Sequence, residues 1–253
     1  MSEISKYKYN AFFVSDVHLC DGKPKTYEAF LKFLKIKAFF SKKLYLLGDI
    51  FEYWAGDDDI NSSFQKKVIN NLKKISKSGT KIFWLSGNRD FLVGEEFAKK
   101  CGFTIITEPY IASISNKKVL LFHGDAQCID DTEYIKFRTK VRNQNWQKSF
   151  LNQSLSERKS LISKMRSQSK KAKTLKEKHT MDVNQNAIND LFLNHNVNIM
   201  IHGHTHLPGL HITKNKFRYV LSDWNCESNI QIGGWIHIDM LGEIIQEKIT
   251  SII

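Results

Sequence analysis

Aspartate, asparagine and histidine residues recur directly after short apolar runs in this chain of 253 residues. Together they supply carboxylate, amide and imidazole groups. The candidate residues are Asp16, His18, Asp49, Asn88, His123, His202 and His204. Hard and borderline divalent cations prefer such oxygen and nitrogen ligands, so the pattern indicates a metal site.

Seven ligands of these types suit two ions. Asp49 offers a carboxylate that can bridge both, and Asp16 and His18 flank one residue, so that in an extended loop they face the same side. Two Mn²⁺-like ions about 3.5–4 Å apart bind a phosphate, lower the pKa of a bridging water and stabilise both oxygens of an in-line displacement. The predicted chemistry is therefore phosphoester hydrolysis.

The elements that must position these residues follow from the apolar pattern. Helical spacing over residues 27–40 and 64–76 alternates with strand-like runs over 11–15, 44–47, 81–85, 119–122 and 197–201. This alternation predicts an α/β fold, and residues 210–249 read as further, antiparallel strands. Ligands of open α/β sheets bind at the carboxyl ends of strands, so the candidate residues should meet at one edge.

One segment carries the entire net charge of +12. Residues 136–179 hold fourteen Lys or Arg and two acidic residues, whereas the remainder of the chain is balanced. The segment lacks Pro, Gly and strand signals from 139 to 181, and its apolar residues fall near helical spacing. We predict one domain over residues 1–253 with an inserted helical segment at about 136–180, whose basic side meets phosphate, nucleic acid or acidic lipid.

Several protein classes are disfavoured by composition. The polar residues 1–10 lack the apolar core of a signal peptide, and no run approaches the roughly 20 apolar residues of a membrane span. The four cysteines form no CxxC pair, which fits a reducing compartment. We expect a cytosolic protein or one resting on a membrane surface.

Each motif alone has an ordinary structural explanation. An Asp after a strand is often a turn or cap residue, and a single His can be a satisfied interior side chain. For two further acids, we favour Asp182 as a helix N-cap and consider Asp125 as a partner that orients a histidine. The five strand ends in order, and the histidines at 202, 204 and 206, favour the metal site.

The set D-x-H, GD, GN-[H/R]-D, H and GHTH resembles the calcineurin-like metallophosphoesterases, whose fold has layered β-sheets flanked by helices. The resemblance implies a first metal held by Asp16, His18, Asp49 and His204, and a second held by Asp49, Asn88, His123 and His202. Arg89 stands where the common motif has a histidine. Arg89 would stabilise transition-state charge, and the catalytic group would comprise Arg89, Asn88 and His204.

The runs GDDD at 56–59, GNRDFL at 87–92 and MDVNQNA at 181–187 are similar to the UDP-2,3-diacylglucosamine hydrolases of lipid A biosynthesis. This implies water attack on the uridine-side phosphorus of UDP-2,3-diacylglucosamine, giving UMP and 2,3-diacylglucosamine 1-phosphate. It also implies two Mn²⁺ ions and a peripheral position on the cytoplasmic face of the inner membrane, with no nucleic-acid partner and a monomeric chain. The implied substrate contacts are Asn88, Arg89, Asp131, Ser169, Lys173, Lys176 and His202.

Two other functions remain open at this point. The basic segment favours a nuclease or cyclic-nucleotide phosphodiesterase of the same superfamily, whereas Arg89 and the apolar residues of the insertion oppose it. A catalytically inactive scaffold for membranes or RNA should have lost ligands, yet every expected ligand type is present.

Overall fold

The computed structural model describes residues 6–175 and 182–252. The strands are β1 (Tyr9–Val14), β2 (Ser41–Leu47), β3 (Lys81–Leu85), β4 (Phe103–Ile106), β5 (Tyr110–Ile114), β6 (Lys117–Leu121), β7 (Ile199–His202), β8 (Gly209–Thr213), β9 (Lys216–Val220), β10 (Gly234–Asp239) and β11 (Ile244–Lys248). The helices are α1 (Pro24–Ile36), α2 (Ser63–Lys77), α3 (Glu95–Cys101), α4 (Thr132–Arg142), α5 (Gln144–Leu151), α6 (Leu155–Leu175) and α7 (Gln185–His195). Short 3₁₀ turns are η1 (Ala38–Phe40), η2 (Asp125–Gln127) and η4 (Ile249–Ser251).

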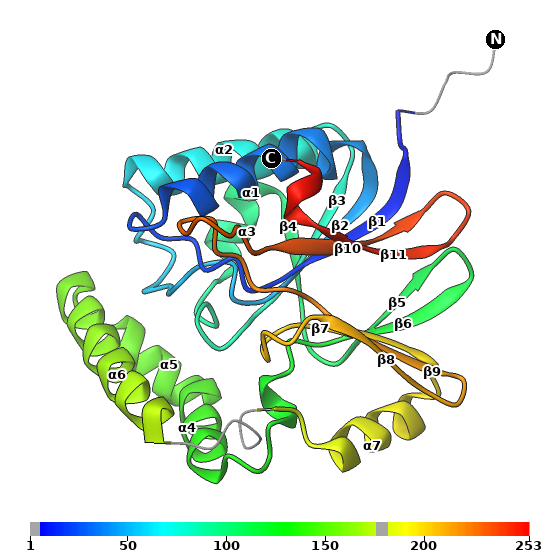
Figure 1. Ribbon diagram of the computed structural model, residues 1–253. Helices are drawn as coiled ribbons and strands as arrows, with labels where there is room; N and C mark the ends of the chain where they lie inside the picture. The colour runs from blue at the N-terminus through cyan, green and yellow to red at the C-terminus, as the bar shows by residue number, and fades with distance from the viewer. Residues whose placement is uncertain (1–5, 176–181, 253) are drawn as a thin grey trace.

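The strands form two sheets, shown in Figure 1. The first has the order β11-β10-β1-β2-β3-β4, with β1 to β4 parallel and β10 and β11 antiparallel to their neighbours. The second has the order β5-β6-β7-β9-β8, in which β6, β7 and β9 are parallel. The predicted α/β fold with layered sheets is confirmed; of the predicted C-terminal antiparallel strands, β9 instead runs parallel to β7.

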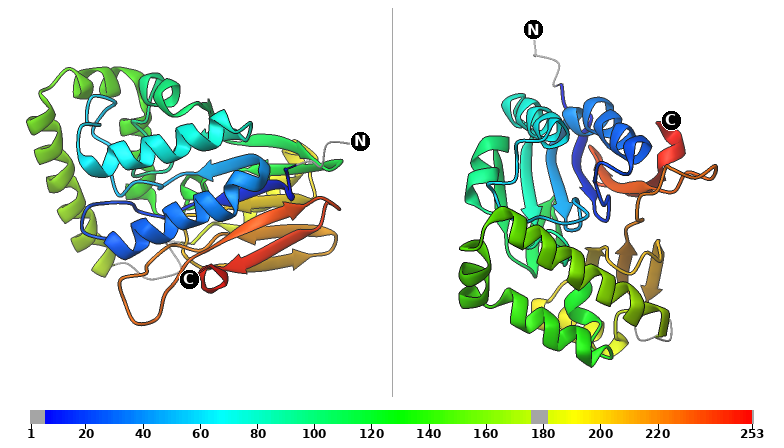
Figure 2. Two further views of the ribbon diagram at one scale, coloured as in Figure 1. Left: turned by 90° about the horizontal axis from the view of Figure 1, so that it is seen from above. Right: turned by 90° about the vertical axis from the view of Figure 1, so that its left-hand side faces the viewer.

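Alternating side chains of the central strands explain the layers. Phe12 and Val14 of β1 pack under helices α1 to α3, whereas Ala11 and Phe13 face the second sheet. The outer face of the second sheet is covered by α7, which contributes Ile188 and Phe192. Both faces of β1 are buried from Ala11 to Val14, and this part of the strand is apolar, as is typical of strands covered on both sides. The result is a sandwich of helices, two sheets and helices (Figure 2).

Most of the basic segment forms helices α4, α5 and α6, which lie together beside the sandwich in Figures 1 and 2. The Arg142 guanidinium of α4 donates to the Gly87 carbonyl at 2.9 Å, just beyond the end of β3. These helices therefore cover the edge where the parallel strands end. Among the described residues, no helix is both long and apolar enough to cross a bilayer.

The GDDD run attaches α6 to the core. Arg158, only 3% exposed, donates from Nη1 to Asp58 Oδ1 at 2.8 Å, pairs through Nη2 with Asp58 Oδ2, and also reaches the Ala55 carbonyl. Lys159 pairs with Asp59 at 2.7 Å, while Asp57 accepts from Gly94 N and Phe97 N at the start of α3. Each acid of the run thus has a separate structural contact.

We expect Arg158→Ala to lower the free energy of unfolding by about 1–3 kcal/mol, because a buried carbonyl and a fork to a carboxylate lose their donor. Urea denaturation measures the change. Lys164→Ala on the exposed side of the same helix is the control and should stay within about 0.5 kcal/mol of the parent. Equal stabilities for both variants would contradict the proposed attachment.

Candidate metal centre

Five residues in the loops after β1, β2 and β7 adopt the left-handed backbone conformation. Their φ angles are 53° for Asp16, 52° for His18, 54° for Asp49, 68° for His204 and 56° for His206. Residues other than glycine seldom adopt such angles, and the strain concentrates at functional sites. The backbone conformation alone therefore distinguishes these five Asp and His residues as candidates for a functional site.

The loops after β2 and β3 approach each other closely enough to require glycine. A Cβ on Gly48, where φ is +86°, would lie 2.5 Å from Gly87 Cα, and a Cβ on Gly87 would lie 2.2 Å from Asp49 Oδ1. The buried Asp90 carboxylate joins both loops, accepting from Ile50 N at 2.9 Å and Gly87 N at 2.8 Å. Burial and the neighbouring Asp49 raise the pKa of Asp90 to about 6.

Asp16, His18 and His206 form the first group of candidate ligands. Their ligand atoms all lie within 4.8 Å of one another. His18 Nε2 and His206 Nε2 are 3.4 Å apart, and Asp16 Oδ1 lies 3.5 Å from His206 Nε2. Within the described residues, the buried Oδ1 of Asp16 accepts no hydrogen bond of ordinary geometry. Such a concentration of lone pairs, two of its three residues buried, fits a cation.

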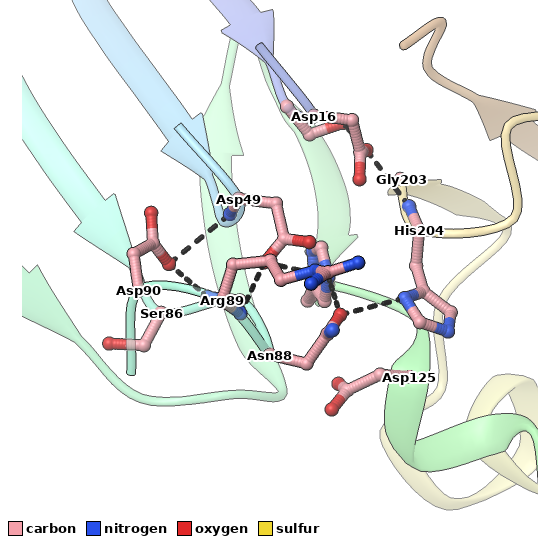
Figure 3. A network of polar contacts seen from close by, with 12 residues as sticks. Asp16, Asp49, Ser86, Asn88, Arg89, Asp90, Asp125, Gly203 and His204 are labelled. Atoms are coloured by element: carbon pink, nitrogen blue, oxygen red, sulfur yellow. Dashed lines mark hydrogen bonds and ion pairs between the residues drawn. The ribbon is translucent and has the colours of Figure 1, made fainter. Parts of the chain in front are cut away.

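Asp49, Asn88, His123 and His204 form the second group, part of which Figure 3 shows. His123 Nδ1 donates to the Leu47 carbonyl at 2.9 Å, which leaves a lone pair on Nε2 of the neutral ring. That nitrogen faces Asn88 Oδ1 at 3.0 Å and Asp49 Oδ1 at 3.6 Å. His204 Nδ1 lies 3.0 Å from the same amide oxygen. These contacts also fit a cation held between them.

Asp16 and Asp49 connect the two groups. Asp16, Asp49 and His123 have ligand atoms within 4.8 Å of one another. Burial lowers the pKa of His123, but Asp49 and Asp16 outweigh it and raise the value to about 9. The protein field at this point therefore favours positive charge, as a binuclear metal site requires.

His202, predicted as a metal ligand and substrate contact, lies behind these groups. Its Nε2 is 3.1 Å from the Arg218 guanidinium, its Nδ1 is 2.9 Å from the Gly203 carbonyl, and its ring stacks on Phe122. Burial and Arg218 lower the pKa of His202 to about 3. Both ring nitrogens thus face protein groups, and the described structure brings His206 into the cluster in its place.

The sequence contained a signal for His206. The GHTH motif runs from Gly203 to His206, so its two histidines are His204 and His206. Strand β7 ends at His202, which makes His202 the last residue of a buried strand and not the first residue of the ligand loop.

Three acids that the sequence did not single out contact the candidate ligands or the loops that carry them. Glu52 Oε2 lies 3.2 Å from His18 Nδ1 and also pairs with Arg166 of α6. Asp223 Oδ2 lies 3.6 Å from His206 Nδ1. Together with Asp90, these carboxylates orient the groups that would bind metal, a role typical of residues around metal ligands.

One expectation for another acid is corrected, and a second acquires a structural context. Asn184, not Asp182, caps α7, since its Oδ1 accepts from Asn186 N and Ala187 N. The Oδ2 of Asp125 accepts from Tyr134 OH at 2.5 Å and Arg138 Nε at 2.9 Å. Arg138 also pairs with Glu108, which accepts from His123 N, so Asp125 joins α4 to the ligand loops.

A cavity of about 490 Å³ opens beside the cluster. Its polar wall includes Asn88, Arg89, Asp131, Ser169 and the two ligands His204 and His206. Its apolar wall comprises Trp54, Phe91, Leu92, Phe137, Trp146, Phe150, Ile162 and Met165. Of the other predicted substrate contacts, Lys173 falls within α6 and Lys176 lies outside the described residues.

Comparison with known proteins agrees with this geometry. Residues 10–208 match the model of the calcineurin-like phosphoesterase family. A UDP-2,3-diacylglucosamine hydrolase of Aromatoleum aromaticum is 43% identical over 85% of this chain and 89% of its own length. Proteins of the same name from Chromohalobacter salexigens and Escherichia coli O9:H4 are each 40% identical, over 83% and 86% of this chain and 87% and 92% of their own lengths. The chain therefore belongs to the calcineurin-like phosphoesterases and, within them, to the UDP-2,3-diacylglucosamine hydrolases.

Proposed function

We propose that this protein hydrolyses the pyrophosphate bond of UDP-2,3-diacylglucosamine in lipid A biosynthesis, releasing UMP and 2,3-diacylglucosamine 1-phosphate. The observation that carries the proposal is the continuity of the apolar cavity with the ligand cluster. A diacyl sugar needs a large apolar space within reach of the reacting phosphate, and burial of acyl chains contributes about 0.8 kcal/mol per CH₂ group. The names of the relatives support the same substrate.

The donor set fits two divalent cations, and we propose Mn²⁺ for both positions. The first ion would be held by Asp16, His18, Asp49 and His206. The second would be held by Asp49, Asn88, His123 and His204. When bound, such a pair activates water and stabilises charge on the phosphoryl oxygens. This assignment replaces His202 by His206 and moves His204 to the second ion.

The remaining polar residues orient and neutralise the diphosphate. Arg89 is fixed at its backbone, where its N–H donates to Asp49 Oδ1 at 2.8 Å, and its guanidinium lines the cavity. A forked cation there stabilises negative charge that develops as the bond to the leaving group breaks. We assign further substrate contacts to Asp131, Ser169, Lys173 and Lys176.

We also propose that the basic helices hold the protein on the anionic cytoplasmic face of the inner membrane, as a monomer. Lys and Arg near an anionic bilayer contribute about 1 kcal/mol each. Exposed Phe137 of α4 and Leu151 of α5 lie among these basic residues, which supports shallow contact with lipid.

The direct test is turnover of the purified, Mn²⁺-loaded protein on UDP-2,3-diacylglucosamine and, in parallel, on DNA and cyclic nucleotides. We expect UMP release from the lipid substrate alone. Turnover of DNA without turnover of the lipid substrate would favour a nuclease, a function that the basic segment also fits because Lys and Arg clusters bind nucleic acid.

Replacement of Arg89 by alanine should retain bound metal and reduce kcat roughly 10²–10³-fold, the usual effect of removing one group that stabilises transition-state charge. Metal analysis and UMP release measure the two quantities separately. Arg89→Lys keeps the charge without the fork and should recover part of the rate. Loss of metal from Arg89→Ala would show that Arg89 supports the ligand loops.

Removal of metal by a chelator should abolish UMP release, because no cation would then activate water or stabilise charge on the phosphoryl oxygens. Readdition of Mn²⁺, Mg²⁺, Co²⁺ or Zn²⁺ one at a time identifies the ions that restore activity, and we expect Mn²⁺ to restore the highest rate. Full activity after exhaustive chelation, with metal absent by elemental analysis, would exclude the proposed chemistry.

A further inference from the structure

A second cavity of about 500 Å³ adjoins the apolar one. The two share a wall made of Glu52, Tyr53, Arg89, Ile162, Arg166 and Ser169. The residues found only in the second cavity are Lys159, Ser163 and Ser167, all on α6. We call this second space the polar cavity.

The polar cavity has the lining of an anion and hydrogen-bond site. Ser163 and Ser167 are four residues apart and so lie on one face of α6. Three cations, Arg89, Lys159 and Arg166, line the space with one carboxylate, Glu52. Arg166 pairs with Glu52, whereas the Arg89 guanidinium makes no ion pair among the described residues. An acyl chain here would strip water from charges and hydroxyls without replacing their partners, which is unfavourable.

We infer that the polar cavity binds the nucleoside monophosphate half of the substrate, while the apolar cavity binds the diacyl sugar half. This rests on the proposed function. The substrate is asymmetric about the bond that breaks, so its two halves need separate spaces that meet at the diphosphate. Arg89 lines both spaces, whereas its neighbour Asn88 lines the apolar cavity. The hydroxyls, carbonyls and N–H groups of uridine match serine hydroxyls, which donate and accept, and the lysine ammonium, which donates.

The attachment of α6 to the GDDD run explains how this wall is held in place. Arg158 and Lys159, which pair with Asp58 and Asp59, precede Ser163 by about one helical turn. The acidic loop thereby fixes the part of α6 that carries the serine face. The same helix contributes Met165 to the apolar cavity alone and Ile162 and Ser169 to both cavities, so α6 borders both halves of the ligand.

The test is calorimetric titration of metal-loaded protein with UMP, inorganic phosphate and 2,3-diacylglucosamine 1-phosphate. Ser163→Phe fills the polar cavity and should weaken UMP binding by at least about tenfold. Binding of phosphate and of the lipid product should change by less than about twofold, because neither needs this space. Ser160→Phe is the matched control, because Ser160 is an exposed residue of the same helix that does not line the cavity. This variant should bind all three ligands as the parent does.

Two results would overturn the inference: unchanged UMP affinity in Ser163→Phe, or weakened lipid-product binding with UMP unaffected. If Ser163→Phe does not fold, as judged by circular dichroism, Ser167→Phe repeats the titration at the other serine. Because binding of UMP is read directly, a parent protein that binds UMP through Ser163 but leaves UDP-2,3-diacylglucosamine intact would contradict the proposed function and not the nucleotide site.

Discussion

Replacement of Asp49 by asparagine is expected to reduce UMP release by roughly 10³–10⁴-fold and to leave the protein with less than its full complement of metal. In the proposed assignment Asp49 holds both ions, and its Oδ1 faces His123 Nε2 while accepting from Arg89 N. An amide keeps the size of the side chain but removes the negative charge that two cations would share. The loss should therefore exceed that of any substitution affecting a single ion.

Elemental analysis and steady-state UMP release on the same preparation measure the two effects. Asp21→Asn, an equal change at an exposed position in the loop after β1, serves as the control and should retain metal and rate. An Asp49→Asn protein with parental activity would remove the bridging role, whatever its metal content.

The second large effect is expected from His206→Ala. Loss of a ligand to the first ion should raise the activation free energy by several kcal/mol. At about 1.4 kcal/mol per factor of ten, this lowers kcat/KM roughly 10³-fold. His206 is partly exposed, with 42% of its side-chain surface accessible, so its truncation should change the unfolding free energy little. Atomic absorption and UMP release report the losses, and circular dichroism checks the fold.

His202→Ala is the paired experiment, because sequence reasoning placed a ligand there. We expect retained metal and a loss of about 1–3 kcal/mol in stability, since the buried Arg218 guanidinium would lose its acceptor. The reverse outcome, metal loss from His202→Ala with normal metal in His206→Ala, would restore the sequence-based assignment.

The fold was largely predictable because its strands are buried on both faces. Residues 81–85 form β3 as expected, and the other central strands differ from their expected bounds by a few residues. Strands β4 and β5 were not anticipated: β4 has only four residues, and β5 alternates exposed and buried positions, so neither presents a continuous apolar run.

It was harder to predict which of the three histidines are candidate metal ligands. Three alternating histidines follow one apolar run, and besides the position of His202 outside the GHTH motif, the end of β7 and the left-handed turns at His204 and His206 distinguish them. The Glu52 and Asp223 contacts join segments far apart in the chain, so no local pattern encodes them. Cavity walls likewise depend on where α6 packs, which the charge pattern of the segment does not specify.

The left-handed backbone at five candidate ligand positions has a consequence for how this chain can change over generations. Glycine would relieve of order 1–3 kcal/mol of strain at each such residue. Asp16, His18, Asp49, His204 and His206 are therefore positions where stability and activity select opposite residues. A lineage released from the need to hydrolyse its substrate should drift toward glycine there and become more stable as it loses its chemistry.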